Sequence, residues 1–90
     1  MKLIRTLVAS AAALLVTLPA LADITVGISL PLTGPASGLG IPMQNQFKLW
    51  PATVAGEKLK VIILDDATDP TKGVQNARRF VTDEKVDLII

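Results

Sequence analysis

The 90-residue chain contains no cysteine and no histidine. Without cysteine it forms no disulfide, and it lacks the lipid-attachment cysteine that a bacterial lipoprotein signal requires. Without histidine the usual general base and the commonest metal ligand are missing, so a zinc site is not expected. The fold must therefore rely on apolar burial, and the sequence predicts no cofactor.

The first 22 residues have the pattern of a secretory signal peptide. Lys2 and Arg5 form a positive start, residues 7–18 are apolar, and small residues at A-x-A spacing end at Ala22. We expect export and cleavage after Ala22. The apolar stretch that ends there has only 17 residues and is interrupted by Pro19, so no stable membrane anchor is expected.

The mature segment is weakly acidic. From Asp23 onward seven basic and eight acidic side chains remain, a formal net charge of −1, whereas the whole chain carries +1. No basic field is left to hold nucleic acid, so no nucleic-acid partner is expected. The pair Arg78–Arg79 is interpreted as a solvated helix face.

The first predicted elements are a strand and a helix. Residues 24–30 alternate between apolar and small or polar side chains, which predicts a strand. Pro42 suits the first position of a helix, because its missing N–H is harmless there. Met43, Phe47 and Trp50 then follow at helical spacing and predict its buried stripe.

Two further strands and a second helix are predicted after Gly56, which is expected in a turn. Residues 58–66 include a nearly unbroken apolar run, typical of a parallel strand covered on both faces, and residues 86–90 begin a third strand. Between them Asp69 and Pro70 match the cap and the first residue of a helix. Four apolar residues are expected on its buried side: Val74, Ala77, Phe80 and Val81.

The predicted order is strand, helix, strand, helix, strand. This alternation indicates an α/β fold with a parallel, Rossmann-like sheet and helices on both faces, joined by right-handed crossovers. The sequence stops inside the third strand. We therefore expect residues 23–90 to be an incomplete domain at the start of a larger protein.

The glycine-containing segment 31–42 allows several interpretations. It does not match a P-loop, because no lysine follows its glycines, and the third glycine of a dinucleotide fingerprint falls on Met43. Turn formation alone accounts for the Gly34–Pro35 step. If the first strand is central, however, residues 32–41 form one wall of the crevice beyond the carboxyl ends of the strands, where α/β sheets bind ligands.

Four features together resemble the periplasmic substrate-binding proteins of branched-chain amino acid ABC transporters. They are the export signal and the segments "ITVGISLPLTGPASGLGIP", "VIILDDATDP" and "NARRFVTDEKVDLII". The resemblance implies a type I periplasmic binding fold, in which two lobes close on a small ligand without chemistry. Residues 23–90 would then be part of the first lobe, located in the periplasm.

The resemblance also implies a ligand, a partner and site residues. The ligand would be an amino acid or a related small carboxylate or amide, and the partner the membrane permease. The family's loop after the first strand reaches the cleft, so Leu39 would pack on the ligand while Ser37 and Gly38 offer a hydroxyl and a backbone N–H. Asp65, Asp66 and Asp69 are interpreted as structural, because N-capping fully accounts for Asp69.

Two other functions stay open from the sequence. One is an exported ligand-sensing domain of the same fold, and the other is a nucleotide-binding enzyme domain, for which the acids after the second strand would hold a ribose.

Overall fold

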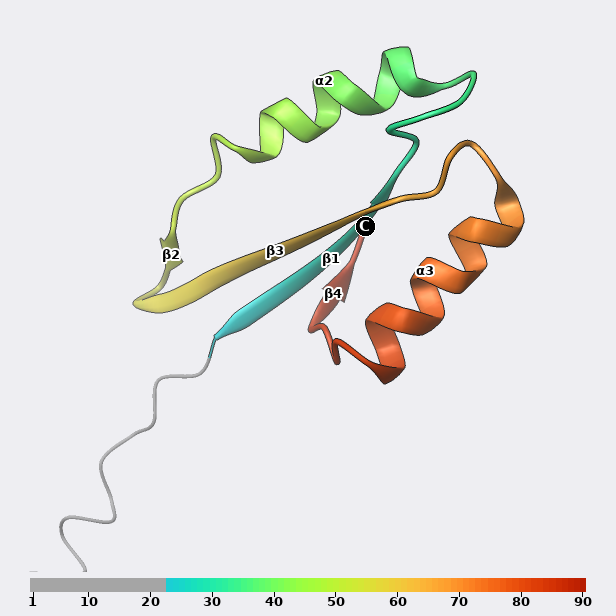
Figure 1. Cartoon of the computed structure of the whole chain (residues 1–90). Coiled ribbons are helices and arrows are strands. Elements are labelled where there is room, and N and C mark those ends of the chain that lie inside the picture. The colour runs from blue at the N-terminus through green and yellow to red at the C-terminus, as the bar shows by residue number, and fades with distance from the viewer. Residues whose placement is uncertain (1–22) are drawn as a thin grey trace, which may run out of the picture.

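The computed structural model describes residues 23–90, so the expected signal peptide of residues 1–22 lies outside the described part. The chain forms a mixed α/β structure in which two helices accompany one sheet (Figure 1). In chain order the elements are β1 (Ile24–Leu30), α2 (Ser37–Phe47), β2 (Thr53–Val54), β3 (Glu57–Asp65), α3 (Pro70–Thr82) and β4 (Leu88–Ile89).

The sheet has the strand order β2-β3-β1-β4. β1 is central and runs parallel to both β3 and β4, with Val26 opposite Val61 on one side and Leu88 on the other. The predicted α/β class is therefore confirmed, and the first strand is central, which is the condition that the crevice interpretation required. The connection from β1 leads to β3 on one side, and the connection from β3 leads back past β1 to β4 on the other side, which places a topological switch point between β1 and β4.

The two helices cover opposite faces of the sheet (Figure 1). Val26, Ile28 and Leu30 are buried on the face that carries α2, where Phe47 packs against them. The alternate residues of β1 face α3, and Gly27 lies directly beneath the ring of Phe80. Because side chains alternate along a strand, β1 supplies one apolar face and one face of small residues.

The prediction that the first helix begins at Pro42 was wrong. α2 begins at Ser37 and contains Pro42 within it. Its N-cap residue, Ala36, makes no side-chain capping bond, so the sequence carried no capping signal there. Pro42 has no N–H, so α2 forms without the intrahelical hydrogen bond that this residue would otherwise donate.

The predicted apolar stripe of α2 is only partly correct. Phe47 joins the core, but Met43 and Trp50 are exposed, and the buried residue of the helix is Gly40. A side chain at Gly40 would collide with the backbone carbonyl of Pro31, so this glycine lets the helix approach the end of β1. The face of α2 that lies closest to the sheet is therefore the one that carries Gly40 and Phe47.

The start of α3 is confirmed, but its predicted buried side is not. Asp69 accepts a hydrogen bond from the Thr71 N–H at 3.0 Å, and Pro70 is the first helical residue. Among the predicted residues only Phe80 is buried, whereas Val74 and Val81 are 54% and 62% exposed.

The buried positions of α3 follow from the sheet face that it covers. Asn76 joins Phe80 there, and its side-chain amide donates to the Ser29 hydroxyl at 3.2 Å and to the Asp65 carbonyl at 3.0 Å. Because one residue turns an α-helix by about 100°, the valine stripe is rotated away from the sheet.

A short hairpin connects α2 to β3 and was missing from the prediction. β2 pairs antiparallel with the start of β3. Ala55 and Gly56 form the turn with φ of 52° and 80°, the two positive values of a type I′ hairpin turn. Gly56 therefore lies in a turn, as expected. The third predicted strand is present as β4, shorter than residues 86–90.

Candidate functional site

The carboxyl ends of β1 and β3 lie side by side at one edge of the sheet. Their last residues, Leu30 and Asp65, are opposite one another in the parallel register. The β1–α2 loop (residues 31–36) and the β3–α3 loop (residues 66–69) leave from this edge (Figure 1). This is the edge at which α/β proteins bind ligands.

Asp65 joins the two loops through its carboxylate. It accepts hydrogen bonds from the N–H groups of Leu32 and Thr33 at 2.9 and 3.2 Å and from the Thr33 hydroxyl at 2.6 Å. It also accepts the N–H of Ala67 at 2.8 Å. All four donors favour the ionised carboxylate.

These bonds hold the pKa of Asp65 low. The Thr33 hydroxyl has the largest effect, followed by the Ala67 N–H, and together with the remaining donors they lower the pKa to about 2 against a partial desolvation that raises it. Asp65 therefore stays charged throughout the physiological range.

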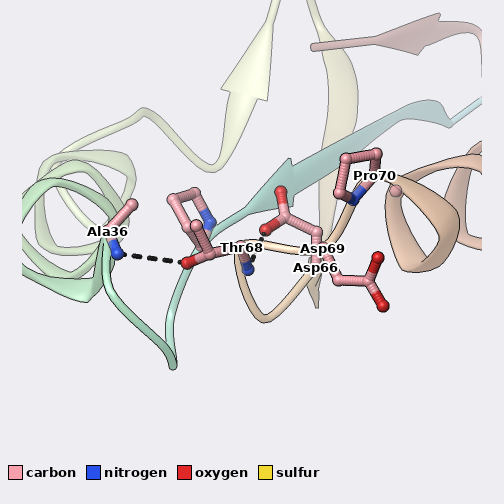
Figure 2. Close-up of a pocket in the computed structure, with 7 residues that line it drawn as sticks. Ala36, Asp66, Thr68, Asp69 and Pro70 are labelled. Carbon is pink, nitrogen blue, oxygen red and sulfur yellow. Dashed lines mark hydrogen bonds between the residues drawn. The ribbon is translucent and has the colours of Figure 1, made fainter.

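Thr68 makes a second connection between the loops. Its hydroxyl donates to the Thr33 carbonyl at 3.0 Å. The same hydroxyl accepts the Ala36 N–H at 3.1 Å (Figure 2). Its own N–H donates to Asp66 at 2.8 Å, which holds the residue in a left-handed conformation with φ of 61°. Gly34, at φ of 83°, packs so closely against Ala67 and Thr68 that a side chain there would clash.

The three predicted site residues lie together in the first turn of α2, not in a loop. Ser37 is half-buried, and its N–H donates to the Gly34 carbonyl at 3.1 Å. The Gly38 N–H meets no acceptor within residues 23–90, and a side chain at this position would meet open space. Leu39 is 71% exposed. The turn therefore presents a free N–H and an exposed apolar side chain beside the sheet edge.

A cavity of about 290 Å³ lies between the two loops and the start of α3 (Figure 2). Its lining contains none of the three predicted residues. It is formed by Pro31, Ala36, Asp66, Thr68, Asp69, Pro70 and Gly73. Its lining residue Ala36 directly precedes the first turn of α2, whereas the switch point lies between β1 and β4.

Two further findings concern the described segment. Within residues 23–90 no group of three or more acidic side chains is arranged to hold a metal ion. No helix in this range is long and apolar enough to cross a membrane.

Sequence reasoning missed the functions of Thr33 and Thr68 at this edge. Both residues follow a predicted strand within four positions, and the carboxyl ends of neighbouring parallel strands meet at one edge. That placement was the available signal. It did not reveal which atoms would pair, because the bonded groups are 32 to 35 residues apart in sequence.

A family model described as periplasmic binding protein matches residues 23–90. The chain belongs to the periplasmic binding protein family. The match covers every described residue, and together with similarity to Leu/Ile/Val-binding proteins it confirms the resemblance to the branched-chain amino acid type expected from the sequence.

The chain is similar both to curated binding proteins and to solved receptors. A Leu/Ile/Val-binding protein of Rhizobium johnstonii is 36% identical over 87 residues, which are 89% of this chain and 24% of that protein. An extracellular ligand-binding receptor from Rhodopseudomonas palustris is 48% identical with a TM-score of 0.75, over 78% of this chain and 20% of that one.

A third relative was solved with a small molecule bound. It is the solute-binding protein of an ABC transporter from Rhodopseudomonas palustris BisB5 in complex with 3,4-dihydroxybenzoic acid. It is 34% identical with a TM-score of 0.71, over 74% of this chain and 20% of that one. The chain thus spans about a fifth of the length of the periplasmic binding proteins that it matches.

Proposed function

We propose that residues 23–90 are the opening part of the first lobe of a solute-binding receptor for an ABC importer. The observation that carries this proposal is the family match across all described residues, together with a sheet whose switch point lies beside β1. The receptor binds its ligand between two lobes and delivers it to a membrane permease without making or breaking a bond. Residues 1–22 direct export to the periplasm and are cleaved after Ala22.

The proposed ligand is an amino acid or a related small carboxylate or amide. Two observations support this class. Curated relatives are described as Leu/Ile/Val-binding proteins, and the ligand of one solved relative, 3,4-dihydroxybenzoic acid, is a small carboxylic acid. Every member of the proposed class carries a carboxylate or an amide oxygen that accepts hydrogen bonds.

The proposed contacts of this segment are made by the first turn of α2. The free N–H of Gly38 lies at a helix N-terminus, where the helix dipole favours a negatively charged group. Ser37 adds a hydroxyl, and exposed Leu39 packs on the apolar part of the ligand.

Isothermal titration of the full-length gene product tests the function. The panel contains leucine, isoleucine, valine, their amides, benzoate, 3,4-dihydroxybenzoate and NAD. We expect saturable 1:1 binding of at least one amino acid or small carboxylate and no heat with NAD. Binding of NAD alone would instead favour a nucleotide-binding enzyme domain. Attachment of the full-length protein to the membrane by a later helix would favour a sensor.

A further inference from the structure

We infer that Thr68 is a positioning residue: its hydroxyl fixes the first turn of α2 from the neighbouring β3–α3 loop, and thereby sets the geometry of the ligand site. The part of this inference that concerns ligand affinity rests on the proposed function. The part that concerns the position of α2 does not, and it can be measured without a ligand.

The first argument comes from how the two helices begin. α3 is capped within its own sequence, because Asp69 accepts the Thr71 N–H. α2 has no such cap, since its N-cap residue Ala36 offers only a methyl group. The Ala36 N–H donates instead to the Thr68 hydroxyl at 3.1 Å, so the start of α2 is fixed by a residue 32 positions away.

The second argument comes from the backbone of the β3–α3 loop. Ala67 and Thr68 have φ of 51° and 61°, values that residues with a Cβ rarely adopt and that a β-branched residue adopts least. Such conformations persist only where the surroundings impose them, and they cluster at functional sites. Here they are imposed by the acceptors Asp65 and Asp66, which take the two N–H groups at 2.8 Å each.

The third argument is that the Thr68 contact forms one half of a closed unit. Asp65 holds the beginning of the β1–α2 loop through Leu32 and Thr33, and Thr68 holds its end through Ala36. Gly34 lies between these attachments with no room for a side chain. A loop attached at both ends and packed in the middle can place the following turn, which carries Ser37, Gly38 and Leu39, in one position.

Four variants of the full-length protein test this inference. Thr68→Val removes the hydroxyl and keeps the shape. Thr68→Gly also removes it and relieves the left-handed backbone, so it covers the case in which Thr68→Val fails to fold. Thr68→Ser keeps the hydroxyl and should therefore behave as the wild type does in both measurements. Thr71→Val is the matched control, because the Thr71 hydroxyl contacts no polar partner within residues 23–90.

The first readout is amide hydrogen exchange of the segment 36–40, which reports local opening. We expect exchange about two- to tenfold faster in Thr68→Val and Thr68→Gly, the effect of one lost hydrogen bond, while Thr68→Ser and Thr71→Val match the wild type. Unchanged exchange in both hydroxyl-free variants, or equal loss in Thr68→Ser, would overturn the inference.

The second readout is affinity for the amino acid or carboxylate that the wild type binds, measured at a temperature where all variants are folded. The hydroxyl-free variants should bind about two- to tenfold more weakly, and Thr71→Val should bind normally. Faster exchange with unchanged affinity would refute the role of Thr68 in ligand binding but leave the proposed function intact. A wild type that binds none of the amino acids or carboxylates would refute the proposed function and the affinity part together, while the exchange data still decide whether Thr68 positions α2.

Discussion

Gly38 and Gly73 are both helical glycines at which an added methyl group would meet no other atom. Alanine at either position should therefore stabilise the protein, by up to about 1 kcal/mol, because glycine is a poor helix former. Their surroundings differ, since Gly38 lies in the proposed ligand-binding turn and Gly73 lines the cavity between the loops and the start of α3. The pair separates effects on stability from effects on binding.

We predict that Gly38→Ala weakens ligand binding about three- to tenfold while leaving the melting temperature equal or higher. The methyl group would occupy the space through which a ligand approaches the free N–H. Gly73→Ala serves as the control and should bind as the wild type does. The opposite result, a loss of affinity in Gly73→Ala alone, would move the ligand to the cavity between the loops. Titration calorimetry and thermal melts of both variants decide between these sites.

Asp65 should make stability depend on pH at the acidic end of the range. Its pKa is lowered in the folded protein, to about 2 from an ordinary value of 3.8, so folding favours the ionised form. Its contribution is fully present above about pH 5 and is lost as the pH falls from about 4 through 2. Asp65→Asn should therefore lower the melting temperature at pH 7, and the difference from the wild type should shrink below pH 4.

Glu57→Gln is the matched control for this measurement. Glu57 begins the same strand that Asp65 ends, and its carboxylate has no hydrogen-bond or ion-pair partner within residues 23–90. The control should leave the pH profile of the melting temperature close to that of the wild type. If Asp65→Asn melted like the wild type at pH 7, the four hydrogen bonds to the carboxylate would not stabilise the fold.

At the scale of elements, the contact between β1 and α3 depends on a glycine under an aromatic ring. A Cβ at Gly27 would come within 2.6 Å of the Phe80 ring. Gly27→Ala should therefore destabilise the protein by about 1–3 kcal/mol, the usual cost of overpacking a core. Combining it with Phe80→Leu should cost less than the two single changes together, because the smaller side chain makes room. Strictly additive losses of unfolding free energy would contradict this packing.

In the hairpin between β2 and β3, a single substitution is expected to stabilise the protein. Ala55 has φ of 52° and is followed by Gly56 at φ of 80°. Asn-Gly is preferred in such a turn, because asparagine adopts the left-handed region at a lower energetic cost than alanine does. Ala55→Asn should raise the unfolding free energy by up to about 1 kcal/mol, measured by denaturant unfolding. A lower unfolding free energy in Ala55→Asn would show that the left-handed backbone at Ala55 does not limit the stability of this hairpin.

The elements that local sequence signals define were predictable, and those defined by tertiary contacts were not. β1, β3 and the start of α3 follow from apolar alternation, an apolar run and the Asp69–Pro70 cap. The start of α2 does not, because Ala36 has no capping side chain and the bond that fixes it comes from Thr68. The same holds for the candidate site. The sequence indicates the sheet edge and the kinds of residue expected there, but not the hydrogen bonds between the loops, because these join residues 32 to 35 positions apart.

The buried side of α3 was mispredicted for a related reason. Its valine stripe is the more apolar one, yet the sheet face opposite presents Gly27 and Ser29, which accommodate a large ring and a side-chain amide. Composition alone therefore favours the wrong stripe, since the partner surface selects shape and hydrogen bonding as well as apolar character.

At the scale of the molecule, the described segment leaves much apolar surface uncovered. Only four apolar side chains of residues 23–90 are buried, namely Val26, Ile28, Leu30 and Phe80. The outward stripe of α3 and the strand β4 are among the exposed apolar parts. Within the described residues β4 is paired with β1 on one side only, so its other edge carries backbone groups that no described strand pairs. An exposed edge next to exposed apolar side chains favours association between chains.

We therefore predict that residues 23–90, produced alone, give no cooperative thermal transition and self-associate. Val74→Lys with Val81→Lys removes exposed apolar surface without changing the buried face of α3. This double variant should reduce self-association, measured by light scattering, and still give no cooperative melt, because four buried side chains cannot offset the conformational entropy lost on folding. A cooperative melt with dispersed amide NMR signals in either version would show that the sheet and its two helices are stable without further lobe structure.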